Sequence, residues 1–118
     1  MNELANGNCF SVAAKIVGGF TWALGDLDAT KGVEVLEEYG AEDPKLVHGT
    51  VTRANDGREH EHAWVEAGDL VFDFSNGLDV VLSASAYHDL GKIKNTKAYT
   101  KEEARDALLT IGHFGPWH

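Results

Sequence analysis

The 118 residues carry 19 acidic and 10 basic side chains, a formal charge of −9, with 43% hydrophobic and 25% charged residues. This is the composition of an ordinary globular protein, so we expect a single domain over residues 1–118. The acidic balance, without a basic cluster, argues against a nucleic-acid partner, and no apolar run is long enough to span a membrane. A single cysteine cannot form an internal disulfide, which favours a reducing, cytoplasmic location.

The N-terminal third predicts two helices. Apolar residues recur at helical spacing over 8–17, and two glycines follow that end or bend the helix. Asp28 is expected to cap a second helix over 29–39. Between the two helices, Trp22 and Leu24 are expected to pack beneath the second one.

The segment 60–75 predicts two short strands joined by a turn at Gly68-Asp69. Because side chains alternate between the faces of a strand, pairing Ala67 with Leu70 separates an apolar face from a mixed one. The apolar face carries Ala63, Val65, Ala67, Leu70, Phe72 and Phe74. The mixed face carries His62, Trp64, Glu66, Val71, Asp73 and Ser75. His62 and Asp73 are then diagonal neighbours across the hairpin, within reach of each other.

The remaining elements extend this hairpin into a larger sheet. The expected elements are a strand over 45–53 that completes an antiparallel meander, an edge strand over 79–82, a short helix from a cap at Ser83 to 90, a strand over 92–99, and a last helix to about 111. Thr100 and Glu103 have the spacing of a capping box for that last helix. Helices first and a sheet afterwards predict an α+β fold, with the N-terminal helices packed on an antiparallel sheet.

The candidate chemistry centres on Cys9. It stands where the first helix begins, and the unpaired N–H groups and dipole of a helix start favour the thiolate. His62 can carry the thiol proton, and Asp73 can hold the imidazole in one orientation. The backbone N–H of Cys9, with the side-chain amide of Asn6 or Asn8, is the expected donor set for an oxyanion. This is a Cys-His-Asp triad, with no metal and no cofactor, that would act through an acyl-enzyme.

The expected substrate is a protein or a peptide-like molecule with an amide, isopeptide or thioester bond. Trp64, on the same face as His62, is the candidate substrate-binding residue. The acidic surface favours a neutral or cationic substrate over an anionic one. The sequence leaves open whether water or another acceptor resolves the acyl-enzyme, and it leaves the oligomeric state open.

Two motifs carry a resemblance to a known superfamily. Gly7-Asn8-Cys9-Phe10 opens a helix, and His62-Ala63-Trp64-Val65-Glu66 with Phe72-Asp73 follows on successive strands. This order resembles the papain-like superfamily in the broad sense, which includes small NlpC-type and transglutaminase-like cysteine enzymes. The closing segment 112–117 looks like the end of small uncharacterised bacterial and phage proteins with this layout. The resemblance implies a compact papain-like core with Cys9 as nucleophile, His62 as base and Asp73 as orienting group. Papain-type enzymes also place a glutamine before the cysteine, and this sequence contains none.

Two alternatives remain at this point. His60 and His62 share a strand face, and with His48 and Asp73 they could form a mononuclear metal site. A non-catalytic binding module on the same fold is the other alternative. Its interface would use the acidic surface and the aromatic residues Trp64, Phe114 and Trp117.

Overall fold

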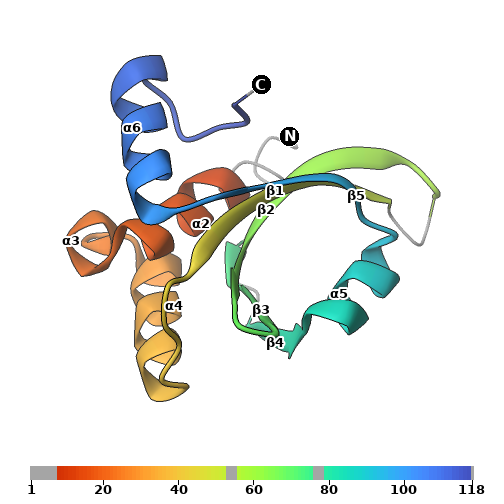
Figure 1. Ribbon diagram of the computed structural model, residues 1–118, viewed down its shortest axis with the longest axis horizontal. Helices are drawn as coiled ribbons and strands as arrows, with labels where there is room; N and C mark the ends of the chain where they lie inside the picture. Colours follow the sequence, from red (N-terminus) through yellow and green to blue (C-terminus); the bar gives the residue numbers. More distant parts are fainter. Residues whose placement is uncertain (1–7, 53–55, 76–78, 118) are drawn as a thin grey trace.

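The computed structural model describes residues 8–52, 56–75 and 79–117. Helices pack on a five-stranded antiparallel sheet with strand order β4-β3-β2-β1-β5, so the α+β prediction is confirmed (Figure 1). The helices are α2 (Cys9–Gly18), α3 (Phe20–Ala23), α4 (Leu27–Glu38), α5 (Ala84–Gly91) and α6 (Lys101–Ile111). The strands are β1 (Lys45–Thr52), β2 (Glu59–Ala67), β3 (Leu70–Asp73), β4 (Val80–Ser83) and β5 (Lys94–Tyr99). Within the described ranges, no helix combines the length and the apolar character that crossing a membrane requires.

The β2–β3 hairpin has the register that the apolar pattern predicts. Its pairs are Ala67↔Leu70, Glu66↔Val71 and Val65↔Phe72. Gly68 holds the turn with a φ of 59°, in the left-handed region that glycine adopts without steric cost. β1 pairs antiparallel with the other edge of β2, which confirms the predicted meander.

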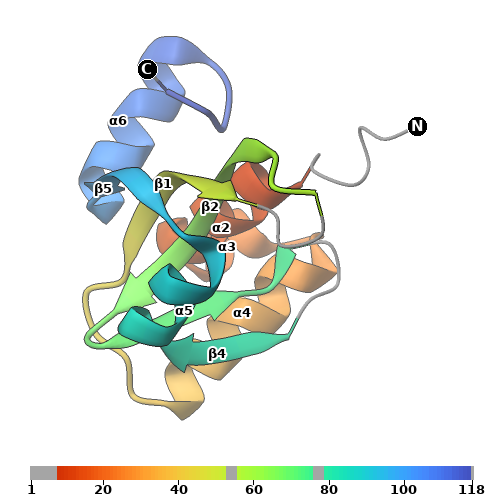
Figure 2. The same ribbon diagram turned by 90° about the vertical axis from the view of Figure 1, so that its right-hand side faces the viewer.

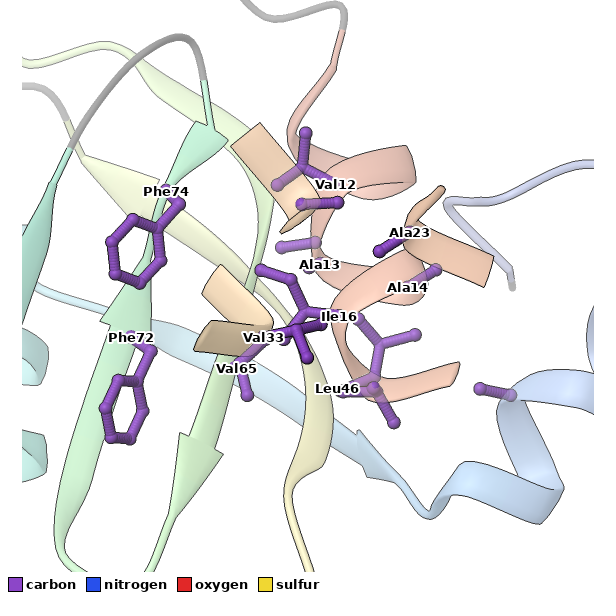
Figure 3. Close-up of a cluster of buried hydrophobic side chains, with 14 of the residues drawn as sticks. Val12, Ala13, Ala14, Ile16, Ala23, Val33, Leu46, Val65, Phe72 and Phe74 are labelled. Carbon is purple, nitrogen blue, oxygen red and sulfur yellow. The ribbon is translucent and has the colours of Figure 1, made fainter. Parts of the chain in front are cut away.

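The first face of the sheet, called here the helix face, is covered by α2 and α4, and it holds the main hydrophobic core (Figure 3). Phe72 and Phe74 belong to this core together with Val12 and other side chains of α2. Gly32 lets α4 approach α2 closely, because a Cβ at this position would lie 2.4 Å from Cδ1 of Ile16. This packing fixes the start of α2 relative to the sheet.

The second face, called here the concave face, curves around α5 (Figure 1). In the rotated view, α5 lies in front of the sheet and α2 and α4 lie behind it (Figure 2). A smaller cluster of Val47, Trp64 and Val71 is buried here, and Tyr87 of α5 packs against it. No residue of α5 is itself buried, so this helix covers its face of the sheet less completely than α2 and α4 cover theirs.

The helix boundaries agree with the sequence analysis at two of the three predicted N-terminal caps. Ser83 caps α5, and Thr100 and Glu103 form the predicted capping box of α6. The cap of α4 was predicted wrongly: Asp26, not Asp28, accepts the N–H of Ala29 at 3.1 Å. Both aspartates have the right side chain for a cap, and the place where α3 ends decides between them.

The prediction for Leu24 was also wrong. This side chain is 61% exposed, whereas Trp22 is half-buried. Leu24 follows the last residue of α3 and has extended backbone angles, so its side chain leaves the helical face that packs inward.

Candidate active site

Cys9 is the first residue of α2, as predicted. Asn8 precedes it as the N-cap, and the Asn8 carbonyl accepts the N–H of Val12 at 2.8 Å, which closes the first helical turn. The Cys9 side chain is fully buried. It lines a small space, together with Ala63 and Asp73, that has no room for a water molecule.

His62 and Asp73 form the pair that the hairpin register predicts. Nε2 of His62 lies 2.9 Å from Oδ2 of Asp73, and both side chains are mostly buried, with 14% and 5% exposed. His62 also makes a side-chain hydrogen bond with Cys9. Because Asp73 occupies Nε2, Nδ1 is the ring nitrogen that remains for the thiol. The structure therefore brings the three predicted residues together in the order Cys9–His62–Asp73.

The charge state of His62 follows from these contacts. Burial by itself would lower the pKa of the imidazole. The hydrogen bonds with Asp73 and Cys9 outweigh the burial and raise the pKa of His62 from 6.5 to about 9. At neutral pH the ring is therefore protonated and can donate from both nitrogens.

Asp73 has further hydrogen-bond donors besides His62. The hydroxyl of Tyr87 donates to Oδ2 at 2.7 Å. The hydroxyl and the backbone N–H of Ser75 donate to Oδ1 at 2.8 and 3.2 Å. Burial acts to raise the pKa of Asp73, but these hydrogen bonds and the charge of His62 hold it below 3.8. The carboxylate is therefore ionised and fixed in orientation.

Tyr87 and Ser75 were missed as site residues by sequence reasoning. Ser75 follows Asp73 by two positions, a spacing at which a side chain commonly bonds to an aspartate, so a local signal existed. Tyr87 lies on α5, 14 residues after Asp73, and nothing in the local sequence indicates that it contacts Asp73. Burial and the neighbouring Asp73 raise the pKa of Tyr87 well above its usual range, so it keeps its proton and acts as a donor.

Trp64 was predicted to bind substrate, but the structure leaves no exposed surface on its side chain for that contact. Its side chain is fully buried. It stacks on His62 with ring centroids 5.9 Å apart, and its Nε1–H donates to Glu66 at 2.8 Å. Glu66 also bonds to Nε2 of His88 on α5 at 2.8 Å. Trp64 therefore supports the imidazole and excludes water behind it.

Asn6 and Asn8 were the two side chains predicted to donate to an oxyanion. Asn6 lies outside the described residues. The side-chain amide of Asn8 donates to Oδ2 of Asp28 at 3.3 Å, which directs it toward α4. This contact uses one of the two N–H groups of the Asn8 amide. The backbone N–H of Cys9, in the first turn of the helix, stays a predicted donor.

The alternative metal site is not assembled. His48 pairs with Ala63, so these two side chains share the helix face, whereas His62 lies on the concave face. The ring of His48 packs between Phe10 and Tyr99, at centroid distances of 4.9 and 5.0 Å. Within residues 8–52, 56–75 and 79–117, no group of three or more His, Cys, Asp or Glu side chains has an arrangement that could hold a metal ion.

The other aromatic residues suggested for a binding interface are packed inward. Trp117 is 6% exposed and belongs to the main core, where its ring meets Tyr99. Phe114 is partly buried against the same core. Neither residue offers the exposed aromatic surface that an interface anchor requires.

No protein-family model, no curated protein and no solved structure matches this chain. The similarity to papain-like enzymes therefore depends on the residues of the site and on their order along the chain. What the site can do has to be argued from its own geometry.

Proposed function

We propose that the protein is a cysteine-dependent hydrolase or acyltransferase in which Cys9 is the nucleophile. The observation that carries the proposal is the hydrogen-bonded chain Cys9–His62–Asp73. A protonated imidazole beside a thiol favours the thiolate, and a buried, ionised carboxylate behind the imidazole fixes the ring. A core cysteine needs neither partner.

In the proposed reaction, the sulfur of Cys9 attacks the carbonyl carbon of an amide, isopeptide or thioester. A C–S bond forms and the carbonyl oxygen becomes an oxyanion. When this intermediate collapses, the bond to the leaving group breaks and His62 gives its proton to that group. Neutral His62 then takes a proton from water or from another acceptor, which attacks the acyl-enzyme and releases the Cys9 thiolate.

The burial of Cys9 adds a requirement to the proposal. Substrate reaches the sulfur only after a movement that exposes it, because the space beside the thiol admits no water. The proposed substrate is a peptide-like molecule, neutral or cationic given the charge of −9. A reducing, cytoplasmic setting, which would keep the thiol reduced, is part of the same proposal.

Alkylation of the native protein tests the nucleophile. Cys9 is the single cysteine, so iodoacetamide modification reports on this site alone. We expect modification well below pH ~8.5, where a free thiol is half ionised. His62→Ala should move the pH profile upward, and His113→Ala, a change at an exposed histidine, should not. Modification that requires denaturant would contradict the proposal and favour a non-catalytic binding module.

Asp73→Asn tests the third member. The amide can donate to the ring as well as accept from it, so it supports the wrong tautomer. We expect its alkylation profile to fall between those of the wild type and His62→Ala. Once a screen of amide and thioester probes has found a substrate, its turnover should drop by on the order of 10–10². Asp69→Asn, in the exposed β2–β3 turn, is the matched control and should behave as the wild type. Equal turnover in Asp73→Asn and wild type would remove Asp73 from the triad.

A further inference from the structure

β5 is an edge strand of the sheet, and its outer side is open. In the strand order β4-β3-β2-β1-β5 it pairs with β1 alone (Figure 2). Within the described ranges, its backbone makes no hydrogen bond to the backbone of a loop or a helix. Five of its six side chains are exposed. The outward-facing N–H and C=O groups of such an edge can pair with a further strand.

Residues 92–101, which include β5, form a basic segment in an otherwise acidic chain. They hold Lys92, Lys94, Lys97 and Lys101 and no aspartate or glutamate, although the whole chain carries a charge of −9. The expectation of a surface without a basic cluster does not hold for this segment. All four lysines are exposed. The segment therefore concentrates positive potential along one edge of the sheet.

The register of β5 places two of these lysines on the same face. Lys97 pairs with His48, and Lys94 pairs with Thr50, two residues further along β1. The extra residue of β5 is accommodated at a register shift, where Asn95 has a φ of 58°. Lys94 and Lys97 therefore both lie on the helix face, beside a pocket of about 470 Å³ that Asn95 and Lys97 help to line.

Most of the positive charge of this segment is not neutralised by ion pairs. Lys94 contacts Glu59 of β2 at 2.7 Å. In the part of the chain that the structure describes, the other three lysines form no ion pair. The ammonium of Lys97 lies over the ring of Tyr99, 5.3 Å from the ring centroid. On the helix face, the acidic Glu59 and Glu61 belong to β2, which β1 separates from β5.

The charge of the edge determines which strand can pair with it. Lysines on an edge strand protect it from pairing with copies of itself. Two β5 strands side by side would bring lysines close to lysines, and like charges on neighbouring strands are destabilising. Opposite charges on neighbouring strands are stabilising. The complementary occupant is therefore a strand with acidic side chains.

We propose that β5 is a docking edge for an extended, acidic segment of a partner protein, which adds to the sheet as a further strand. Its backbone pairs with the open side of β5, and its aspartate or glutamate side chains on the helix face meet Lys94 and Lys97. The pocket beside Lys97 has room for another of its side chains. This interaction goes beyond the proposed function, because neither Cys9 nor His62 belongs to this edge of the sheet.

Peptide binding to the native protein tests the docking edge. The probe is acetyl-Thr-Glu-Val-Glu-Val-Thr-amide, whose acidic side chains share one face of a strand. The reference peptide has lysine in place of both glutamates. NMR follows the backbone amide signals of β5 during each titration, together with their hydrogen exchange. We expect the acidic peptide to bind about 10-fold or more tightly than the lysine peptide. It should also slow exchange at alternate β5 amides, which face outward.

A third peptide separates strand pairing from charge attraction alone. It has the acidic sequence with a methyl group on the backbone nitrogen of each central residue, so it keeps the charge and loses the backbone donors. We expect it to bind about 10-fold or more weakly than the acidic peptide, because the hydrogen bonds to β5 are lost. Equal binding of the two peptides would overturn the added strand.

Charge-reversal variants locate the binding surface. Lys97→Glu should weaken binding of the acidic peptide roughly tenfold, because an attraction becomes a repulsion. Lys97→Gln should weaken it in the same direction by less, which keeps the test valid if the reversed charge perturbs the strand. Lys31→Glu on α4 lowers the net charge by the same amount as Lys97→Glu and is the matched control. Lys31 is exposed and pairs only with Asp79 among the described residues, so this variant should bind as the wild type does.

The remaining outcomes would assign the edge to something else. Equal effects of Lys97→Glu and Lys31→Glu would overturn the location. Binding of single-stranded oligothymidylate as tight as that of the acidic peptide would overturn the protein partner in favour of a nucleic acid. Dimerisation that slows the same β5 amides without peptide would assign the edge to a second copy of the chain. None of these measurements involves the thiol of Cys9, so the failure of this inference and that of the proposed enzyme are distinguishable.

Discussion

The two faces of the sheet use the same strands for different purposes. On the helix face, Ala63 and Val65 of β2 are fully buried against α2 and α4. On the concave face, His62 and Glu66 of the same strand make hydrogen bonds with Asp73 and His88. The cover of the concave face is α5, none of whose residues is buried. Stability is therefore concentrated on the first face, and polar groups that can do chemistry gather on the second.

This division has a physical basis. An apolar face gains free energy in proportion to the area removed from water, so thick helical cover is favoured there. Buried polar groups gain little unless each is hydrogen-bonded, and a site needs access from solvent. A helix that covers its face only in part, such as α5, satisfies both needs. Its Tyr87 hydroxyl donates a hydrogen bond to Asp73, and a groove stays open beside Asp73.

The largest effect is expected from a change on the helix face. Phe72 is fully buried in the main core. Phe72→Ala should lower the free energy of unfolding by about 4 kcal/mol, through lost burial and the cavity left behind. Urea denaturation measures this change. Leu27→Ala, at a side chain that is 88% exposed, is the control and should be near neutral. A loss below about 1 kcal/mol for Phe72→Ala would mean that the main core does not lie on the helix face.

On the concave face, the protonation of His62 is expected to control part of the stability. The pKa of about 9 lies above the ordinary 6.5, so the stabilisation is fully present below pH 6.5 and is lost as the pH rises through about 9. It should amount to on the order of 3 kcal/mol. The measurement is the free energy of unfolding against pH, compared with His62→Gln, which cannot titrate. Parallel curves for the two proteins would rule out the charged pair.

A pair of glycines compares the packing of the two covers. Gly32→Ala in α4 forces a methyl group against Ile16 and should cost about 2 kcal/mol by overpacking. Gly91→Ala at the end of α5 meets its nearest atom at 3.1 Å, on Ile93, and should cost clearly less. Thermal unfolding of the two variants gives the ranking. A greater loss of stability for Gly91→Ala than for Gly32→Ala would mean that α5 is packed more tightly than α4.

The smallest effect is expected from Tyr87→Phe, which deletes one donor to Asp73. Because His62 and Ser75 still bond to this carboxylate, the loss should be about 1.5 kcal/mol. The ring signals of His62 should also shift in an NMR titration, since the charge on its partner oxygen is less stabilised. Tyr39→Phe, at a tyrosine that is 55% exposed, is the matched control and should change neither quantity. An unchanged His62 titration in Tyr87→Phe would make the tyrosine a packing residue only.

Much of the fold follows from the sequence. The strict alternation from Ala63 to Phe72 fixes the hairpin register, because a slip of one residue would expose the apolar set. Thr100 and Glu103 fix the start of α6 through contacts within a single turn. Since Asp73 lies on the paired strand, its approach to His62 also follows from that local register.

Contacts between distant elements were decided only by the tertiary structure. The packing of α2 and α4 on the helix face brings Cys9 to His62, across 53 positions of sequence, and no local pattern encodes that distance. No local pattern encodes the contact of Tyr87 on α5 with Asp73 or the burial of Trp64 against His62 either. Alternation along a strand says which residues share a face. It does not say which element will cover that face, and burial, exposure and access to the site depend on that cover.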